Sequence, residues 1–85
     1  MKIIYSPEFL RRYDKLPGQV KEKAEQREEI FLNDPFDKRL KTHKLKGELD
    51  GFWAFSVDFK YIIIFRFEEK HTVRFYSIGG HSIYF

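Results

Sequence analysis

The sequence predicts an α+β fold: a short N-terminal strand, then an antiparallel helical hairpin packed on an antiparallel β-meander. Residues 7–32 carry apolar side chains at helical spacing, interrupted at Pro17-Gly18. Three later runs, between residues 52 and 78, are rich in β-branched and aromatic residues instead. Only three or four residues separate neighbouring runs, and connections that short join antiparallel strands.

Length and composition limit the class of protein. The 85 residues are enough for one domain, residues 1–85, with one modest core. Hydrophobic residues make up 42% of the chain and aromatic residues 19%, which excludes a disordered polymer. The absence of cysteine excludes disulfides, cysteine zinc ligands and thiol nucleophiles. No apolar run is long enough for a signal peptide or membrane span, so we expect a cytoplasmic protein without a membrane partner.

The N-terminal half is expected to hold one strand and two helices. Residues 2–5 are β-branched and aromatic and predict the strand. Ser6 is a helix cap and Pro7 suits the first helical position, so a first helix starts here and ends at Pro17-Gly18. Strong helix formers from residue 19 to about residue 32 predict the second helix, which stops before Pro35.

The C-terminal half is expected to be the meander. Its strands correspond to residues 52–57, 61–67 and 72–78. The second run is apolar on both faces, which places it at the centre of the sheet with the helices covering one side. Gly79-Gly80 is expected to break the last strand.

Residues 38–47, which we call the basic segment, carry five permanent positive charges and one histidine without an acid. The net charge of +3 is a weak argument for nucleic acid, but a local patch of this kind attracts phosphate whatever the total charge. Leu40 and Leu45 are placed to attach the segment to a core. The predicted anion-binding side chains in it include Arg39, Lys41, Lys44 and Lys46.

Two histidines are candidates for catalysis. Cations around His43 favour its neutral imidazole, which suits a general base that takes the proton of a ribose 2′-OH. The alternative is an exposed histidine in a solvated loop. His81 follows two glycines, and Tyr84 and Phe85 come next, where an aromatic ring is available to stack on a base. The alternative there is that the terminal aromatics fold back on the core.

Arg66 and Arg74 lie in runs joined by a short turn, so they are placed to share one face and extend the basic surface. Salt bridges to Glu68, Glu69 or Asp58 are an equal alternative. The sequence has no phosphate-binding loop, dinucleotide motif or carboxylate cluster, which argues against nucleotide binding and metal-dependent hydrolysis.

The order of these elements, together with the stretches RLKTHKLKG (residues 39–47) and IGGHSIYF (residues 78–85), resembles the RelE/ParE toxin superfamily over essentially the whole chain. It is most similar to the YafQ-like mRNA interferases of type II toxin–antitoxin systems. The resemblance implies a metal-independent endoribonuclease without a small-molecule cofactor, which cuts ribosome-bound mRNA by 2′-OH attack on the adjacent phosphate. The implied partners are a cognate antitoxin protein, mRNA and ribosomal RNA.

The resemblance also assigns roles to residues. His43 matches the histidine of the family's basic loop, His81 the histidine near the C-terminus and Phe85 an aromatic used at the site, while Lys44 and Lys46 match positions that contact RNA. Asp58 replaces one acid of the YafQ-like pattern, and Ile62 stands where many relatives carry arginine. A second hypothesis is therefore a non-catalytic homologue that only binds antitoxin or ribosome, or a ParE-like gyrase inhibitor.

Overall fold

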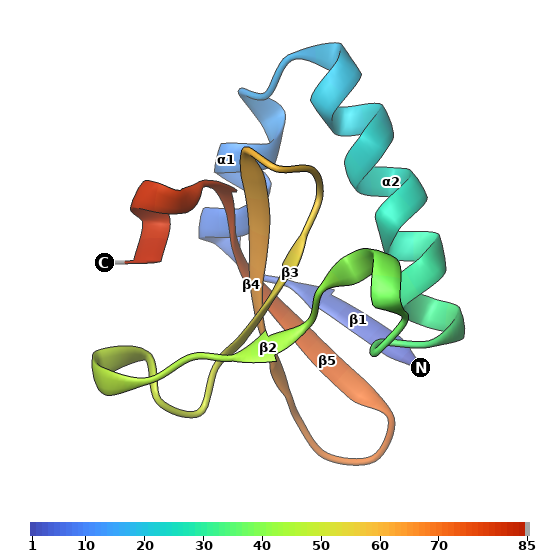
Figure 1. Ribbon diagram of the computed structural model, residues 1–85, viewed down its shortest axis with the longest axis vertical. Helices are drawn as coiled ribbons and strands as arrows, with labels where there is room; N and C mark the ends of the chain where they lie inside the picture. The colour runs from blue at the N-terminus through green and yellow to red at the C-terminus, as the bar shows by residue number, and fades with distance from the viewer. Residues whose placement is uncertain (85) are drawn as a thin grey trace.

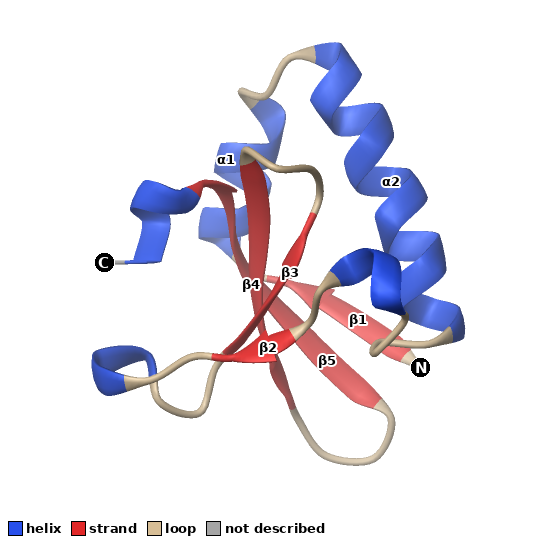
Figure 2. Cartoon of the chain, viewed as in Figure 1, coloured by secondary structure: helices blue, strands red, loops and turns tan. Residues whose placement is uncertain are grey.

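The computed structural model describes residues 1–84 and contains one five-stranded sheet with two helices (Figures 1 and 2). The strands have the order β1-β5-β4-β3-β2; β1 and β5 pair in parallel, and the other neighbouring strands pair antiparallel. This confirms the predicted α+β fold, with β4 at the centre of the sheet. The elements in chain order are β1 (Lys2–Tyr5), α1 (Pro7–Asp14), α2 (Gly18–Asn33), the 3₁₀ helix η1 (Lys38–Leu40), β2 (His43–Lys44), η2 (Gly47–Leu49), β3 (Trp53–Ser56), β4 (Tyr61–Phe67), β5 (Thr72–Gly80) and η3 (His81–Tyr84).

Ser6 connects the start of α1 to the sheet. Its hydroxyl accepts a hydrogen bond from the backbone N–H of Phe9 (3.0 Å) and donates one to the carbonyl of Tyr76 (2.7 Å). The prediction that Ser6 caps the first helix is therefore confirmed, and the Ser6 hydroxyl also donates a hydrogen bond to a carbonyl of β5. Pro7 occupies the first helical turn, where its missing N–H costs nothing.

The break between the helices differs from the prediction. The first helix ends at Asp14, and Gly18 begins α2 instead of terminating α1. Pro17 explains the difference, because the residue before a proline avoids helical angles. The carbonyl of Pro17 then accepts hydrogen bonds from Val20 and Lys21, so the proline serves as the start of α2.

The main core lies between the sheet and the two helices. Four phenylalanine rings without solvent exposure form its centre, and the ring centroid of Phe31, on α2, lies 4.9 Å from Phe55 and from Phe65. The fourth ring, Phe75, lies 5.5 Å from Phe31. One residue of α2 thus contacts all three strands of the meander, which fixes the helix on this face of the sheet.

A smaller core covers the opposite face, which we call the open face because no α-helix of residues 1–84 packs on it. Its buried members are Leu45, Ala54, Ile62 and Ile64, with Ile83 of η3 packed against them. The predicted break at Gly79-Gly80 is wrong, because β5 continues in register with β4 through Gly80. A side chain at Gly79 would meet the Ile83 methyl at 2.8 Å, so this glycine makes room for η3.

No helix among residues 1–84 has both the length and the apolar character needed to cross a lipid bilayer.

Candidate nucleic-acid interface

The basic segment crosses the edge of the sheet from one face to the other. Leu40 is fully buried in the main core with Phe31, whereas Leu45 is buried in the smaller core under the open face. Between them, His43 pairs with Ala54 and forms the edge strand β2 with its neighbour. Both leucines therefore anchor the segment, as predicted, and they do so on opposite sides of β3.

A backbone contact sets the protonation pattern of the His43 ring. Lys41 adopts a left-handed conformation (φ 53°) after η1, and its carbonyl lies 3.0 Å from Nδ1 of His43. Because a carbonyl only accepts hydrogen bonds, Nδ1 carries the proton. The other nitrogen, Nε2, is then free in the neutral ring to accept a proton from a ligand. His43 is also exposed, so a substrate can reach it.

The alternation of β2 separates His43 from one of its basic neighbours. His43 is opposite Ala54 and lies on the open face, whereas Lys44 is opposite Trp53 and lies on the face of the helices. The ammonium of Lys44 is 5.5 Å from the centroid of the Trp53 ring, a cation–π contact. The RNA contact of Lys44 stays a prediction. Lys41 and Lys46 are exposed, and among residues 1–84 neither forms a salt bridge or a cation–π contact.

Arg39 already has an acidic partner. Its Nη2 lies 2.9 Å from Oδ2 of Asp37, and its Nε donates to Oδ1 at 3.0 Å. The Arg39 hydrogen bonds lower the pKa of Asp37 to about 2. The acid stands one residue before the basic segment, so the charge of Arg39 is partly compensated and its RNA contact also stays a prediction.

Arg66 and Arg74 extend the positive charge over the open face. They are directly opposite each other on β4 and β5. Arg74 lies 3.9 Å from Glu68, so a long salt bridge accounts for one arginine, while the exposed Arg66 guanidinium lies 5.8 Å from the ring centroid of Phe52. Like charges at facing positions destabilise a sheet, and a bound anion relieves that repulsion.

Phe52 and Tyr76 are candidate contacts that sequence reasoning missed. Their rings meet edge to face at 4.9 Å, next to Arg66, and both are partly exposed. Aromatic rings beside a guanidinium suit a single strand of RNA, because the rings stack on bases while the cation binds phosphate. The alternation of β5 places Tyr76 on the same face as Arg74, because Val73 and Phe75 both lie in the main core. Phe52 directly precedes β3 and packs against the smaller core of that face.

His81 and Tyr84 lie in η3, at the other end of this face. The Nε2 of His81 lies 3.3 Å from the carbonyl of Phe59 and donates to it, which leaves Nδ1 free. Tyr84 packs against the smaller core, and burial raises the pKa of its hydroxyl. Of the two alternatives for this terminal aromatic, the structure therefore shows the one in which it folds back on the core. Phe85, the predicted neighbour at the site, lies outside the described residues.

β2, which begins with His43, and the red C-terminal turn η3, which begins with His81, lie at different ends of the sheet (Figure 1). The strand registers separate the two histidines by three inter-strand spacings and about four residues along the strands, on the order of 15–20 Å between their backbones. Each ring is oriented by a different carbonyl, from Lys41 and from Phe59. At this separation, the two rings would meet different nucleotides of an RNA segment lying across the face.

The sequence matches no family model and no curated protein. The structure resembles solved bacterial toxins. The YoeB/ParE toxin from Agrobacterium tumefaciens is 18% identical over 95% of this chain and 99% of its own, with a TM-score of 0.82. YafQ from E. coli strain BL21(DE3) is 23% identical over 99% and 97%, with a TM-score of 0.81. YoeB from the Staphylococcus aureus YoeB–YefM complex is 15% identical over 95% and 97%, with a TM-score of 0.77.

This is the RelE/ParE toxin fold. The identities are all below 25%, so these similarities establish the architecture and leave the chemistry to the residues of this chain.

Two positions depart from the RelE/ParE pattern. Ile62, where the resemblance implies arginine, is 1% exposed in the smaller core with Ile83 of η3, so its own side chain supplies no cation. Oδ1 of Asp58 accepts hydrogen bonds from the N–H groups of Lys60 and Tyr61, both at 2.8 Å. Asp58 thereby stabilises the turn between β3 and β4, and its catalytic role stays a prediction. Within residues 1–84, no three histidine, aspartate or glutamate side chains gather as metal ligands do.

Proposed function

We propose that this protein is the toxin of a type II toxin–antitoxin system and that it cleaves mRNA on the open face of its sheet. The observation that carries the proposal is the fold of the YafQ and YoeB toxins combined with His43, whose Nε2 is free and exposed on the face that bears Arg66. A base beside fixed cations is what cleavage by an internal hydroxyl requires.

The proposed reaction uses the RNA itself as nucleophile. Phe52 and Tyr76 stack on bases, and Arg66 with the exposed lysines of the basic segment binds phosphates. Nε2 of His43 takes the proton of a ribose 2′-OH, and the resulting oxygen attacks the adjacent phosphorus. The bond to the 5′-oxygen breaks, and that oxygen takes a proton from water, while His81, whose Nδ1 is free, contacts the RNA farther along the open face. The products are a 2′,3′-cyclic phosphate and a 5′-hydroxyl end.

The proposed partners follow from the same comparison. YafQ forms a toxin–antitoxin complex with DinJ, and YoeB forms one with YefM. We accordingly propose a protein antitoxin for this chain, ribosome-bound mRNA as its substrate, ribosomal RNA as a contact, and the cytoplasm as its location.

The buried Ile62 and the turn-forming Asp58 favour a second candidate, a homologue that binds without cutting. Brief expression in bacteria followed by mapping of mRNA 5′ ends separates the candidates. The proposed toxin produces new 5′-hydroxyl ends within coding regions. Growth arrest without new mRNA ends would support the binding-only candidate, and arrest with DNA double-strand breaks would support a gyrase inhibitor.

A further inference from the structure

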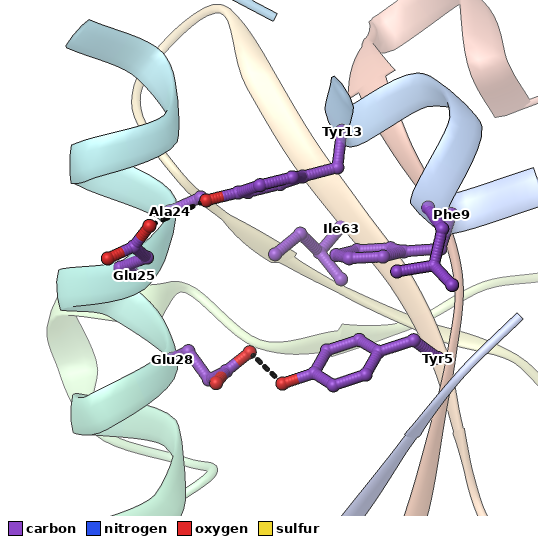
Figure 3. Close-up of a pocket in the computed structure, with 8 residues that line it drawn as sticks. Tyr5, Phe9, Tyr13, Ala24, Glu25, Glu28 and Ile63 are labelled. Atoms are coloured by element: carbon purple, nitrogen blue, oxygen red, sulfur yellow. Dashed lines mark hydrogen bonds between the residues drawn. The ribbon is translucent and has the colours of Figure 1, made fainter. Parts of the chain in front are cut away.

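A cavity opens on the helix side of the sheet, away from the open face. It has a volume of about 220 Å³ and lies between α1 and α2 (Figure 3). Its base and walls are apolar and aromatic, and two glutamates of α2 stand at its edge. The lining residues are Tyr5, Phe9, Leu10, Tyr13, Ala24, Glu25, Glu28 and Ile63.

Each glutamate has one oxygen engaged by a tyrosine. The Tyr5 hydroxyl donates to Oε1 of Glu28 at 2.8 Å, and the Tyr13 hydroxyl donates to Oε2 of Glu25 at 2.7 Å (Figure 3). The second oxygen of each carboxylate keeps its capacity to accept. Within residues 1–84 neither carboxylate forms a salt bridge. The site therefore has two negative charges that are hydrogen-bonded but not neutralised.

Burial makes one of these charges costly. Desolvation raises the pKa of the Glu28 carboxyl above its usual value, although its hydrogen bond with Tyr5 opposes the shift. Nearby Glu25 and Glu29 raise it further by repulsion. A cation placed beside Glu28 would relieve both effects.

The aromatic walls suit the same kind of ligand. The rings of Tyr5, Phe9 and Tyr13 form a row with centroid distances of 5.4 and 6.1 Å. The ammonium of Lys21 already lies 5.7 Å from the Tyr13 ring centroid, so this ring accepts a cation. The volume is smaller than the roughly 300–1,000 Å³ of pockets for drug-sized molecules, which indicates an occupant of side-chain size.

We propose that this cavity binds a small organic cation with a short apolar stem, an alkylguanidinium or alkylammonium group. The charged end meets the free oxygens of Glu25 and Glu28, while the stem packs on Phe9 and Ile63. Leu10 is 53% exposed and Tyr5 37% exposed at the rim, so the cavity is open to solvent. None of these residues belongs to the proposed RNA site, so this site stands or fails independently of RNA cleavage.

The test compares two probes of the same shape. N-butylguanidinium is positively charged, and N-butylurea is its neutral counterpart. Titration followed by NMR is expected to move the Ile63 methyl signals and the Tyr13 ring signals with N-butylguanidinium. Because the carboxylates select charge, N-butylurea is expected to bind at least about tenfold more weakly. Equal binding of both probes, or shifts located away from the cavity, overturns the proposal.

Matched variants test the role of the carboxylates. The double variant Glu25→Gln/Glu28→Gln keeps an acceptor for each tyrosine and is expected to weaken N-butylguanidinium binding about tenfold or more. Glu48→Gln/Asp50→Asn removes two acidic charges from exposed residues in and next to η2, away from α1 and α2, and is expected to change the affinity less than about twofold. Unchanged affinity in a double variant with wild-type circular dichroism contradicts the proposal.

N-acetylarginine amide distinguishes the source of the cation. Binding comparable with that of N-butylguanidinium supports an arginine side chain of a partner protein as the occupant. Binding of N-butylguanidinium alone supports a free small cation.

Discussion

His43 illustrates how a single backbone contact assigns a chemical role to a side chain. Its place in a basic segment was visible in the sequence, but its protonation pattern depends on the carbonyl of Lys41, which a left-handed turn aims at the ring. No sequence pattern predicts that contact.

For Lys44 and Arg39 as well, the sequence did not reveal the orientation or the partner of the side chain. His43 and Lys44 are consecutive residues of β2, so their side chains point to opposite faces of the sheet. A strand of two residues is too short for its periodicity to be recognised in the sequence. Arg39 is held by Asp37, which stands just outside the basic segment. Residue types were therefore predictable from the sequence, whereas their faces and partners depended on tertiary pairing.

Tyr13 gives a prediction for stability at alkaline pH. Burial and the hydrogen bond to Glu25 raise its pKa from 10.0 to about 12. The unfolded chain loses this phenolic proton first, so the contribution of Tyr13 to stability is complete below pH 10 and is lost as the pH rises toward 12. Urea unfolding at pH 9 and pH 11 is expected to show a smaller free energy of unfolding at pH 11. In Tyr13→Phe this decrease is expected to be smaller, and an identical decrease in both proteins contradicts the account.

Ser6 gives a prediction for the cap of α1. Ser6→Ala removes the acceptor for the Phe9 N–H and the donor for the Tyr76 carbonyl, and Ser6 is 8% exposed. We expect the free energy of unfolding to fall by about 1–3 kcal/mol. Ser82→Ala, at an exposed serine of η3, is expected to change it by less than about 0.5 kcal/mol. Chemical denaturation measures both, and equal effects would show that the Ser6 hydrogen bonds contribute nothing specific.

At the scale of elements, the periodicity of apolar residues was sufficient to predict the long helices and strands but not the short ones. The helices and the three meander strands follow from their apolar spacing. The two-residue β2 and the 3₁₀ helices carry no such signal. The predicted strand break at Gly79-Gly80 was wrong because glycine occurs both in turns and in strands where another side chain packs closely on the backbone. Here Gly79 makes room for the side chain of Ile83.

The two glycines of β5 form a matched pair of substitutions. In Gly79→Ala the new methyl would lie 2.8 Å from Cγ2 of Ile83, so η3 has to move. In Gly80→Ala the nearest atom is the Lys60 carbonyl oxygen at 3.8 Å, an ordinary contact. We expect Gly79→Ala to lower the free energy of unfolding by about 1–3 kcal/mol and to shift the His81 ring signals in NMR spectra. Gly80→Ala is expected to differ from the parent by less than about 1 kcal/mol. A larger effect at Gly80 contradicts the described packing of η3.

At the scale of the whole molecule, two local surfaces carry charges of opposite sign. The net charge is only +3, but Arg66 and Arg74 lie on the open face, while Glu25 and Glu28, which line the cavity, lie on α2. The open face thus suits an anion and the cavity between α1 and α2 suits a cation, while both helices also carry arginines and lysines.

This distribution predicts how salt affects RNA binding. Arg66→Ala is expected to weaken binding of single-stranded RNA and to reduce the slope of log affinity against log salt concentration by about 0.7, the value for one phosphate contact on a single strand. Arg11→Ala removes the same charge from α1 and is expected to leave the slope unchanged. Fluorescence anisotropy at several salt concentrations measures both slopes. If the two variants lower the slope equally, RNA does not bind specifically at the open face.

The most direct test of the central claim is the rate at which His43→Ala cuts mRNA in a purified translation reaction. We predict a rate lower than that of the parent by about 10²–10⁴, with 2′,3′-cyclic phosphate ends in the parent's products. His71→Ala, at an exposed histidine in the turn between β4 and β5, is predicted to cut at the parental rate. Parental cleavage by His43→Ala, or products ending in a 3′-hydroxyl, would contradict the assignment of His43 as the general base.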